Sequence, residues 1–245
     1  FMVFGSGAAQ EMHRRWFESH IDKFNLSYSN RSDEYHGLSI AGPNSRKVLE
    51  KIVRDDVSNE KFKFRDSRRM FVGGVPAIIN RISFTGELGY EIYVAPHYQL
   101  KLYEELMEAG KEFNIKPFGG RALMSMRLEK NWGAWTLDYR PDFTAKETGL
   151  DAFINWDKEF IGKESAQKEN SSNKLVPLIV ETNEIDVTNN EAVLNGDQSI
   201  GYVTSGGFAH FVNKSVAFTF VDQKKIKSEN KIQVEINGDL FNCSI

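Results

Sequence analysis

The chain has 245 residues, of which 40% are hydrophobic and 27% are charged, so it is long enough for one or two domains with cores of their own. Its formal net charge of −3 argues against broad nucleic-acid binding, and no apolar run approaches the roughly 18 residues that predict a membrane span. The single cysteine, Cys243, excludes an internal disulfide framework and is typical of a reducing compartment such as the cytoplasm. We therefore expect no nucleic-acid partner and no membrane partner.

The first part of the chain alternates between strand and helix patterns. Strands are predicted over residues 1–4, 26–29 and 36–41, and a helix over residues 8–21. A second helix begins after Pro43, which suits a first helical turn. Because the chain begins with a strand-like run and not with Met, we expect it to be a piece of a longer polypeptide.

Residues 81–94 predict a β-hairpin or a tight bend, because two strand-like runs flank a Gly-containing break at residues 85–89. In the second run Glu91 and Tyr93 share one face, opposite three apolar side chains. A carboxylate inside such a strand either faces solvent or lies in a pocket, where it accepts hydrogen bonds from a ligand. The pattern alone leaves both interpretations open.

Two helices follow the hairpin. Residues 98–113 show the clearest helical periodicity, and residues 121–130 predict a shorter helix whose apolar side chains surround it and indicate burial on several sides. A helix after a strand hairpin favours an α+β arrangement. The irregular stretch 131–149 carries Trp132 and Trp135, which either cover the core or line a binding site.

The polar stretch 168–174 is the best domain boundary, with an α+β region over residues 1–167 and a second domain over residues 175–245. Short strands and Asn-Gly-Asp turn signals predict a small β-barrel after this linker. Its expected strands are residues 175–181, 192–194, 199–204, 216–221, 232–236 and 240–245.

The sequence offers a binding site more readily than a bond-breaking one. It has no phosphate-binding glycine loop, no metal-ligand spacing and no activated Ser or Cys nucleophile, so no metal is expected. Glu91 instead lies near Phe84 and Tyr93, and a loop rich in Trp follows later in the chain. Aromatic walls and a carboxylate that accepts paired N–H donors suit a flat, hydrogen-bonding ligand.

Six motifs in order carry a family resemblance. They occupy residues 37–49, 82–91, 127–130, 147–150, 160–163 and 203–206, and the third reads Arg-Leu-Glu-Lys. Together they resemble the folate-binding family of the glycine-cleavage T-protein, an aminomethyltransferase. The pattern is most similar to the C-terminal folate-binding region of dimethylglycine and sarcosine dehydrogenases.

The resemblance implies a T-protein-like α+β fold, followed by a small C-terminal β-barrel, with tetrahydrofolate as the cofactor. It places Glu91 at the family's pterin-binding glutamate, Phe84 where many members have a Tyr near the pterin, and Phe64 at another aromatic of that pocket. Tyr93 and Trp135 are expected beside them. The family's folate-tail arginine falls on Leu123 here, so Arg121 is the candidate for that role, while Arg127 is expected to be a structural ion-pair partner.

The resemblance also implies an activity, namely the transfer of an aminomethyl or methylene unit from a methylated or aminomethyl amine to folate. The family's key aspartate lies upstream of the motifs present, so no catalytic residue is assigned, and Asp138, Asp142 and Asp151 do not match it. The expected partners are folate, the small amine donor, and an upstream flavin domain or a lipoyl carrier protein. FAD would be needed only with a separate upstream domain.

Four alternatives stay open. The chain is a transferase, the folate-binding half of a flavin-dependent dimethylglycine or sarcosine dehydrogenase, or another demethylase of the family. A non-catalytic folate-binding module is the alternative from a different functional class. The expected compartment is the cytoplasm, or the mitochondrial matrix in a eukaryote.

Overall fold

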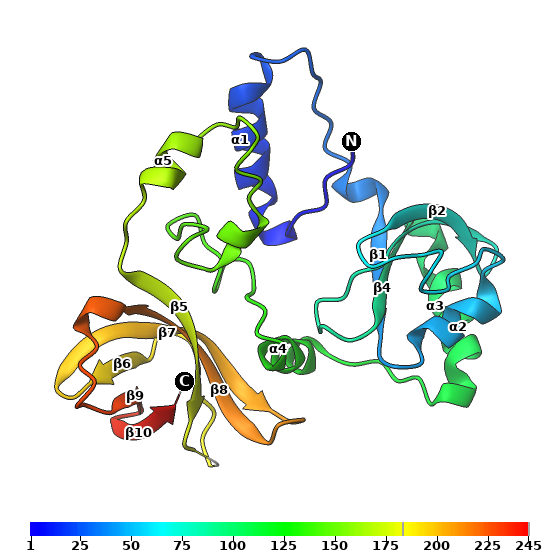
Figure 1. Cartoon of the computed structure of the whole chain (residues 1–245). Helices are drawn as coiled ribbons and strands as arrows, with labels where there is room; N and C mark the ends of the chain where they lie inside the picture. Colours follow the sequence, from blue (N-terminus) through cyan, green and yellow to red (C-terminus); the bar gives the residue numbers. More distant parts are fainter. Residues whose placement is uncertain (183, 245) are drawn as a thin grey trace. The chain divides into compact units, whose positions relative to one another are not determined.

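The computed structural model describes residues 1–182 and 184–244, and it divides into two compact units. One unit is Glu11–Leu123, and the other combines Phe1–Gln10 with Met124–Ile245. Figure 1 shows the elements of both units in the colours of the sequence.

The unit Glu11–Leu123 is an antiparallel sheet covered on one face by helices. The sheet has the strand order β1-β4-β3-β2, and α2 and α3 lie beside it in Figure 1. Side chains of both helices and of the sheet form one hydrophobic core. The helices are α1 (Gln10–Ile21), α2 (Ser45–Ile52) and α3 (Gln99–Gly110). The strands are β1 (His36–Ala41), β2 (Ser67–Val72), β3 (Val75–Asn80) and β4 (Gly89–Val94).

Strand β4 shows why this sheet has a core face and an open face. Tyr90, Ile92 and Val94 are buried against the helices, while Glu91 and Tyr93 are half-buried on the opposite face. This alternation follows from the two-residue period of a strand, and it confirms the facing predicted from the sequence.

Two expected strands in this part of the chain are absent. Residues 1–4 and 26–29 are irregular and largely exposed, and they pair with no strand among the described residues. Strand-like composition is not sufficient, because a strand needs a partner for its backbone hydrogen bonds.

The expected hairpin exists, but its first strand lies earlier than predicted. It is β3, which ends at Asn80, and residues 81–88 form the loop. The backbone of Arg81 bonds to Arg65 and Asp66 instead of to β4, so the ladder cannot continue through it.

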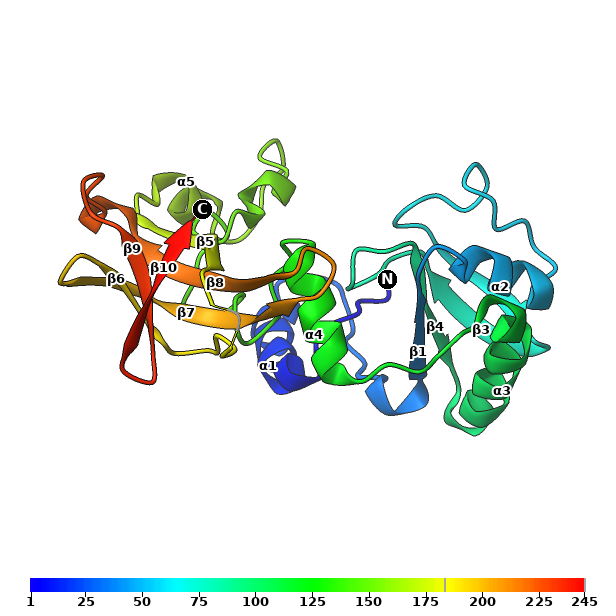
Figure 2. The same cartoon turned by 90° about the horizontal axis from the view of Figure 1, so that it is seen from below.

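The second unit is built on a closed six-stranded barrel with the order β10-β5-β8-β7-β6-β9, which confirms the predicted C-terminal barrel. Figure 2 shows β7 and β8 running side by side as its longest hairpin. The strands are β5 (Asn173–Val180), β6 (Ala192–Asn195), β7 (Gln198–Ala209), β8 (Lys214–Asp222), β9 (Ile232–Ile236) and β10 (Asp239–Ser244). Ile245, expected at the end of the last strand, lies outside the described residues.

Two helices accompany the barrel. Helix α4 (Gly120–Glu129) crosses the division between the units, and α5 (Lys163–Lys168) precedes β5. The expected burial of α4 on several sides is wrong, because its buried side chains are Arg127 and Leu128. The apolar Leu123, Met124 and Met126 are half-buried, and Ala122 is exposed. Short 3-10 turns occupy Gly7–Ala9, Ser32–Glu34, Pro96–Tyr98, Lys111–Phe113, Leu150–Phe153 and Gln223–Lys225.

The expected linker, residues 168–174, runs from the end of α5 into the start of β5. Contacts within the structure group residues 124–167 with the barrel, so the domain boundary at this linker stays a prediction. In the part of the chain that the structure describes, no helix has both the length and the apolar character to cross a membrane.

Candidate functional site

Glu91 stands in a row of polar side chains on the open face of the sheet. It pairs across β4 with Ser39 of β1 and with Asn80 of β3, and Asn80 pairs in turn with Ser67 of β2. Directly paired residues on neighbouring strands point to the same face. We call Ser39, Glu91, Asn80 and Ser67 the polar row.

The Glu91 carboxylate accepts one hydrogen bond, from the hydroxyl of Tyr93 to Oε2 at 2.7 Å. Burial, together with this carboxylate, raises the pKa of the Tyr93 phenol, so Tyr93 remains a protonated donor. Gly37 of β1 gives the phenol ring its room, because a Cβ there would lie 3.0 Å from the ring. Glu91 is therefore held in place from one side, and its Oε1 accepts no hydrogen bond from the residues described.

Asn80 is the most buried member of the polar row, with 6% of its surface exposed. Its Oδ1 is sealed from solvent and has no hydrogen-bond partner among the described residues. An unsatisfied buried acceptor costs about 1–3 kcal/mol. The Oδ1 atom of Asn80 therefore adds no hydrogen bond that would stabilise the fold.

The other residues expected at the site are more scattered along the structure. Phe84 is half-buried in the loop between β3 and β4, and Phe64 is 69% exposed in the segment before β2. Arg121 is exposed in the first turn of α4. Trp135, 37% exposed, belongs to the unit that contains the barrel. Of the expected residues, the structure brings Glu91 and Tyr93 into direct contact.

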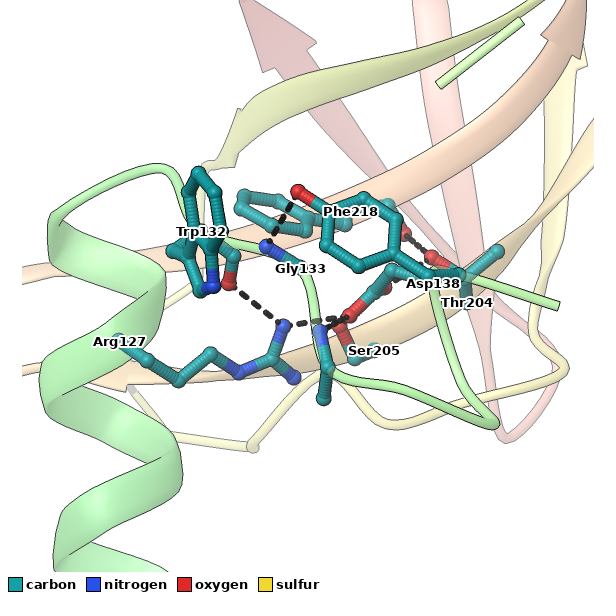
Figure 3. Close-up of polar contacts among 9 residues, drawn as sticks. Arg127, Trp132, Gly133, Asp138, Thr204, Ser205 and Phe218 are labelled. Atoms are coloured by element: carbon teal, nitrogen blue, oxygen red, sulfur yellow. Dashed lines mark hydrogen bonds and ion pairs between the residues drawn. The ribbon is translucent and has the colours of Figure 1, made fainter. Parts of the chain in front are cut away.

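A second polar cluster lies in the barrel unit, around Asp138 (Figure 3). Its Oδ2 accepts hydrogen bonds from Nη1 of Arg127 at 2.5 Å and from the backbone N–H of Ala134 at 2.7 Å. Its Oδ1 accepts from the hydroxyls of Thr204 at 2.5 Å and Ser205 at 2.6 Å. The Arg127 and Asp138 side chains are 1% and 0% exposed, and such a buried pair needs this many partners to offset its lost hydration.

A β-bulge in β7 explains how two consecutive residues reach the same carboxylate. The register with β8 shifts between Val203 and Ser205, so Thr204 is an extra residue in the strand. Consecutive side chains of a regular strand point to opposite faces, whereas a bulge re-aims one of them. Figure 3 shows Thr204 and Ser205 both directed at Asp138.

The Asp138 cluster fixes the loop that carries the tryptophans. Arg127 also donates to the carbonyl of Trp132 at 3.2 Å (Figure 3). The Gly133 N–H donates to the Tyr139 hydroxyl at 3.1 Å. A Cβ at Gly133 would lie 2.6 Å from the Tyr139 ring, so the loop requires glycine there. Burial lowers the pKa of the Arg127 guanidinium, and the Asp138 carboxylate opposes that shift. Arg127 is the structural ion-pair partner predicted from the sequence.

These two clusters differ in what they can do chemically. Both oxygens of Asp138 accept hydrogen bonds within the fold, whereas Oε1 of Glu91 accepts none from the described residues. Among the described residues, no three His, Cys, Asp or Glu side chains converge as ligands for a metal ion. The site on the sheet is thus suited to recognise a ligand by hydrogen bonds.

Sequence reasoning missed Asn80 and the partners of Asp138. Asn80 ends an apolar run over residues 75–79, and a polar residue at that point was the available signal. The family resemblance gives Asp138 no role, although an expected ion pair of Arg127 needs an acidic partner. Nothing local in the sequence reveals the bulge that brings Thr204 and Ser205 to it.

Both parts of the chain match models of known protein domains. Residues 1–158 match the family model described as the GCVT N-terminal domain, and residues 173–245 match the glycine cleavage T-protein C-terminal barrel domain. The structure is similar to the crystal structure of glycine cleavage system aminomethyltransferase T from Bartonella henselae, with a TM-score of 0.81. That match covers 98% of this chain and 65% of the other at 21% identity, so it shows the fold.

Two curated relatives illustrate the range of sequence similarity. Mitochondrial dimethylglycine dehydrogenase of Homo sapiens is 34% identical over 241 residues, which is 95% of this chain and 28% of that protein. Aminomethyltransferase of Thermoanaerobacter pseudethanolicus is 30% identical over 243 residues, which is 97% of this chain and 65% of that protein. The chain therefore spans less than two thirds of the length of either relative.

Proposed function

Because this chain belongs to the glycine cleavage T-protein family, we propose that it binds tetrahydrofolate and serves in folate-dependent one-carbon transfer. The unit transferred is an aminomethyl or methylene group, and its donor is a methylated or aminomethyl amine. The chain acts as an aminomethyltransferase-like enzyme, or as the part of one that holds folate.

The observation that carries this proposal is Glu91. Its carboxylate is half-buried on the open face of the sheet, oriented by Tyr93, and it keeps Oε1 for another donor. A pterin ring is flat and presents adjacent N–H groups along one edge, and hydrogen bonds from such groups to a carboxylate are of the stronger, charge-assisted kind. Phe84, half-buried in the adjoining loop, supplies an aromatic side chain to the same unit.

The protein's part in the reaction is to bind and orient the folate nitrogen that attacks the one-carbon unit. Such positioning lowers the entropic cost of bringing two reactants together. Phe64, Trp135 and Arg121 remain proposed contacts of folate, each to be tested by its own substitution. FAD belongs to this scheme only through a separate flavin domain, and a lipoyl carrier protein is the alternative donor partner.

A second candidate function has its own support. The relative from Homo sapiens carries the name dimethylglycine dehydrogenase, and this chain aligns with 28% of it. In that scheme the chain is the folate-binding half of a larger, flavin-dependent enzyme and accepts the carbon that the other half releases. The compartment, cytoplasm or mitochondrial matrix, is part of the same proposal.

The substitution Glu91→Ala tests folate binding. Loss of a hydrogen bond to a charged group should weaken the affinity for tetrahydrofolate by about 1.5–3 kcal/mol, measured by isothermal titration calorimetry. Glu235→Ala is the matched control, since Glu235 is an exposed strand glutamate of the barrel and should leave the affinity unchanged. Equal affinity of wild type and Glu91→Ala would contradict the proposal.

Turnover separates the candidate functions. A transferase should form methylenetetrahydrofolate from an aminomethyl donor and tetrahydrofolate, with release of ammonia, when no flavin is present. The folate half of a dehydrogenase should do so only when the flavin-bearing part oxidises the amine. Binding of folate without turnover in either mixture would favour the non-catalytic module.

A further inference from the structure

Asn80 is the neighbour of Glu91 in the polar row. The two residues are directly paired across β3 and β4, so their side chains point to the same face of the sheet. Neighbouring strands lie about 4.8 Å apart. Two side chains at that spacing can reach one edge of a single planar ring. Helices α2 and α3 pack on the opposite face of the sheet, so they cover neither side chain.

The amide of Asn80 presents one end only. Its Oδ1 is sealed and unpartnered, so the 6% of Asn80 that remains exposed does not come from that atom. Nδ2 is not among the sealed atoms without a partner, so it is the end of the amide left open to a ligand, and an amide nitrogen only donates hydrogen bonds. Next to it, the Glu91 carboxylate only accepts them.

We propose that Asn80 is a second recognition group of this site and that it determines which ring the site takes. Nδ2 donates to a ring carbonyl oxygen, while Glu91 accepts from the N–H groups beside that carbonyl. The site thereby selects a lactam edge, as in a 2-amino-4-oxo-pyrimidine ring, over an edge with an amino group in place of the oxygen. This inference rests on the proposed function, because the ring in question is that of folate.

The burial of Asn80 supports a role in recognition and argues against a role in folding. A buried polar side chain that stabilises a fold does so through its hydrogen bonds, and Oδ1 makes none with the described residues. Replacement of an unsatisfied polar group by an apolar one is neutral or stabilising. Asn80 is also uncharged, so it can stand beside Glu91 without the repulsion that a second carboxylate would add.

The test compares two ligands on one protein. The whole chain is titrated with 5-formyltetrahydrofolate and with its 4-amino-4-deoxy counterpart, in which an amino group replaces the 4-oxo oxygen and the adjacent ring nitrogen N3 carries no hydrogen. The effect of an Asn80 substitution on each ligand therefore isolates the contact of Asn80 from the contacts of Glu91. Wild type should prefer the 4-oxo ligand. Asn80→Leu should lose about 5- to 10-fold in affinity for the 4-oxo ligand, the scale of one hydrogen bond, and keep its affinity for the 4-amino ligand.

The melting temperature distinguishes a role in recognition from a structural role. Asn80→Leu should melt at the same temperature as wild type or at a higher one, whereas loss of a structural hydrogen bond would lower the melting temperature. Asn80→Ala is the second variant in case the larger side chain packs badly, and it should show the same loss of ligand discrimination. Ser67→Ala is the control, because Ser67 lies in the polar row but is exposed and one strand further from Glu91.

The outcomes are distinct. Equal weakening of both ligands by the Asn80 variants, or no change in either, would overturn the role of Asn80 while leaving Glu91-dependent folate binding intact. Equal affinity of wild type for the two ligands would overturn that role as well. Binding of neither ligand by wild type would overturn the proposed function and this inference together.

Discussion

The carboxylates of Asp138 and Glu91 differ in how many hydrogen bonds they accept within the fold. Asp138 receives four hydrogen bonds inside the fold, from Arg127, Ala134, Thr204 and Ser205. From the residues that the structure describes, Glu91 receives one, donated by Tyr93. A carboxylate whose acceptor positions are all filled has nothing left for a ligand, whereas one that is oriented but not saturated can bind N–H donors.

The substitution Asp138→Asn tests the structural half of this contrast. Loss of the negative charge leaves the buried Arg127 guanidinium without its counter-charge, and breaking a buried ion pair from one side costs about 3–5 kcal/mol. We expect a decrease of about 3 kcal/mol in the free energy of unfolding, measured by urea denaturation, because Asn retains part of the hydrogen bonding.

Asp142→Asn is the matched control for that measurement. Asp142 pairs with Arg140, but both side chains are exposed, so this pair should contribute less than about 1 kcal/mol. If Asp138→Asn and Asp142→Asn unfolded at the same urea concentration, the Asp138 cluster would not be what holds the loop to the barrel.

At the scale of the element, β7 depends on small residues where it meets its neighbours. A Cβ at Gly201 would run into the carbonyl oxygen of Phe220 on β8, and a backbone atom of a paired strand cannot move aside. At Gly207, in the same strand, the only described atom within 4 Å of an added Cβ is Leu128 Cδ1, at 3.6 Å. The two glycines therefore differ in what the fold demands of them.

Gly201→Ala should destabilise the barrel by about 2 kcal/mol or more, as expected for overpacking against a fixed neighbour. Gly207→Ala should change the free energy of unfolding by less than about 1 kcal/mol, because the added methyl group meets ordinary van der Waals space. Thermal denaturation followed by circular dichroism would compare them. If Gly207→Ala lowered the free energy of unfolding as much as Gly201→Ala, the close contact at Gly201 would not be the reason for its glycine.

At the scale of the whole molecule, two connecting segments differ in how they are held. Residues 114–119 lead from the 3-10 turn after α3 to α4, and all of them except the half-buried Ile115 are exposed. The expected linker is tied down, since Ser171 donates to Glu147 at 2.5 Å and Ser172 donates to Asp222 at 2.7 Å. Backbone that is hydrogen-bonded and covered resists proteolysis because it must open locally before it is cut.

Limited digestion with proteinase K should follow this order. We expect cleavage within residues 114–119 first, within residues 168–174 second, and within the barrel strands last, with the fragments identified by mass spectrometry. Early cleavage inside residues 175–244 with the linker intact would refute the predicted boundary before the barrel.

Much of the fold could be predicted because its signals are local. The two-residue period of β4 determined which side of the strand meets the core, and helical periodicity located α3. The turn signals after residue 174 predicted the barrel strands, and the ordered motifs predicted the family. Where such signals lacked a partner strand, as at residues 1–4 and 26–29, composition alone gave a wrong prediction.

The sequence by itself determined the family, the two kinds of architecture and the position of Glu91 on a strand, since each depends on residues close together in the chain. Tertiary structure decided the rest. Asn80 became a neighbour of Glu91 through strand pairing, and Asp138 acquired Thr204 and Ser205, 66 and 67 positions away, through a bulge in the barrel. Register and long-range hydrogen bonds depend on how distant segments pair, and no local period in the sequence encodes that choice.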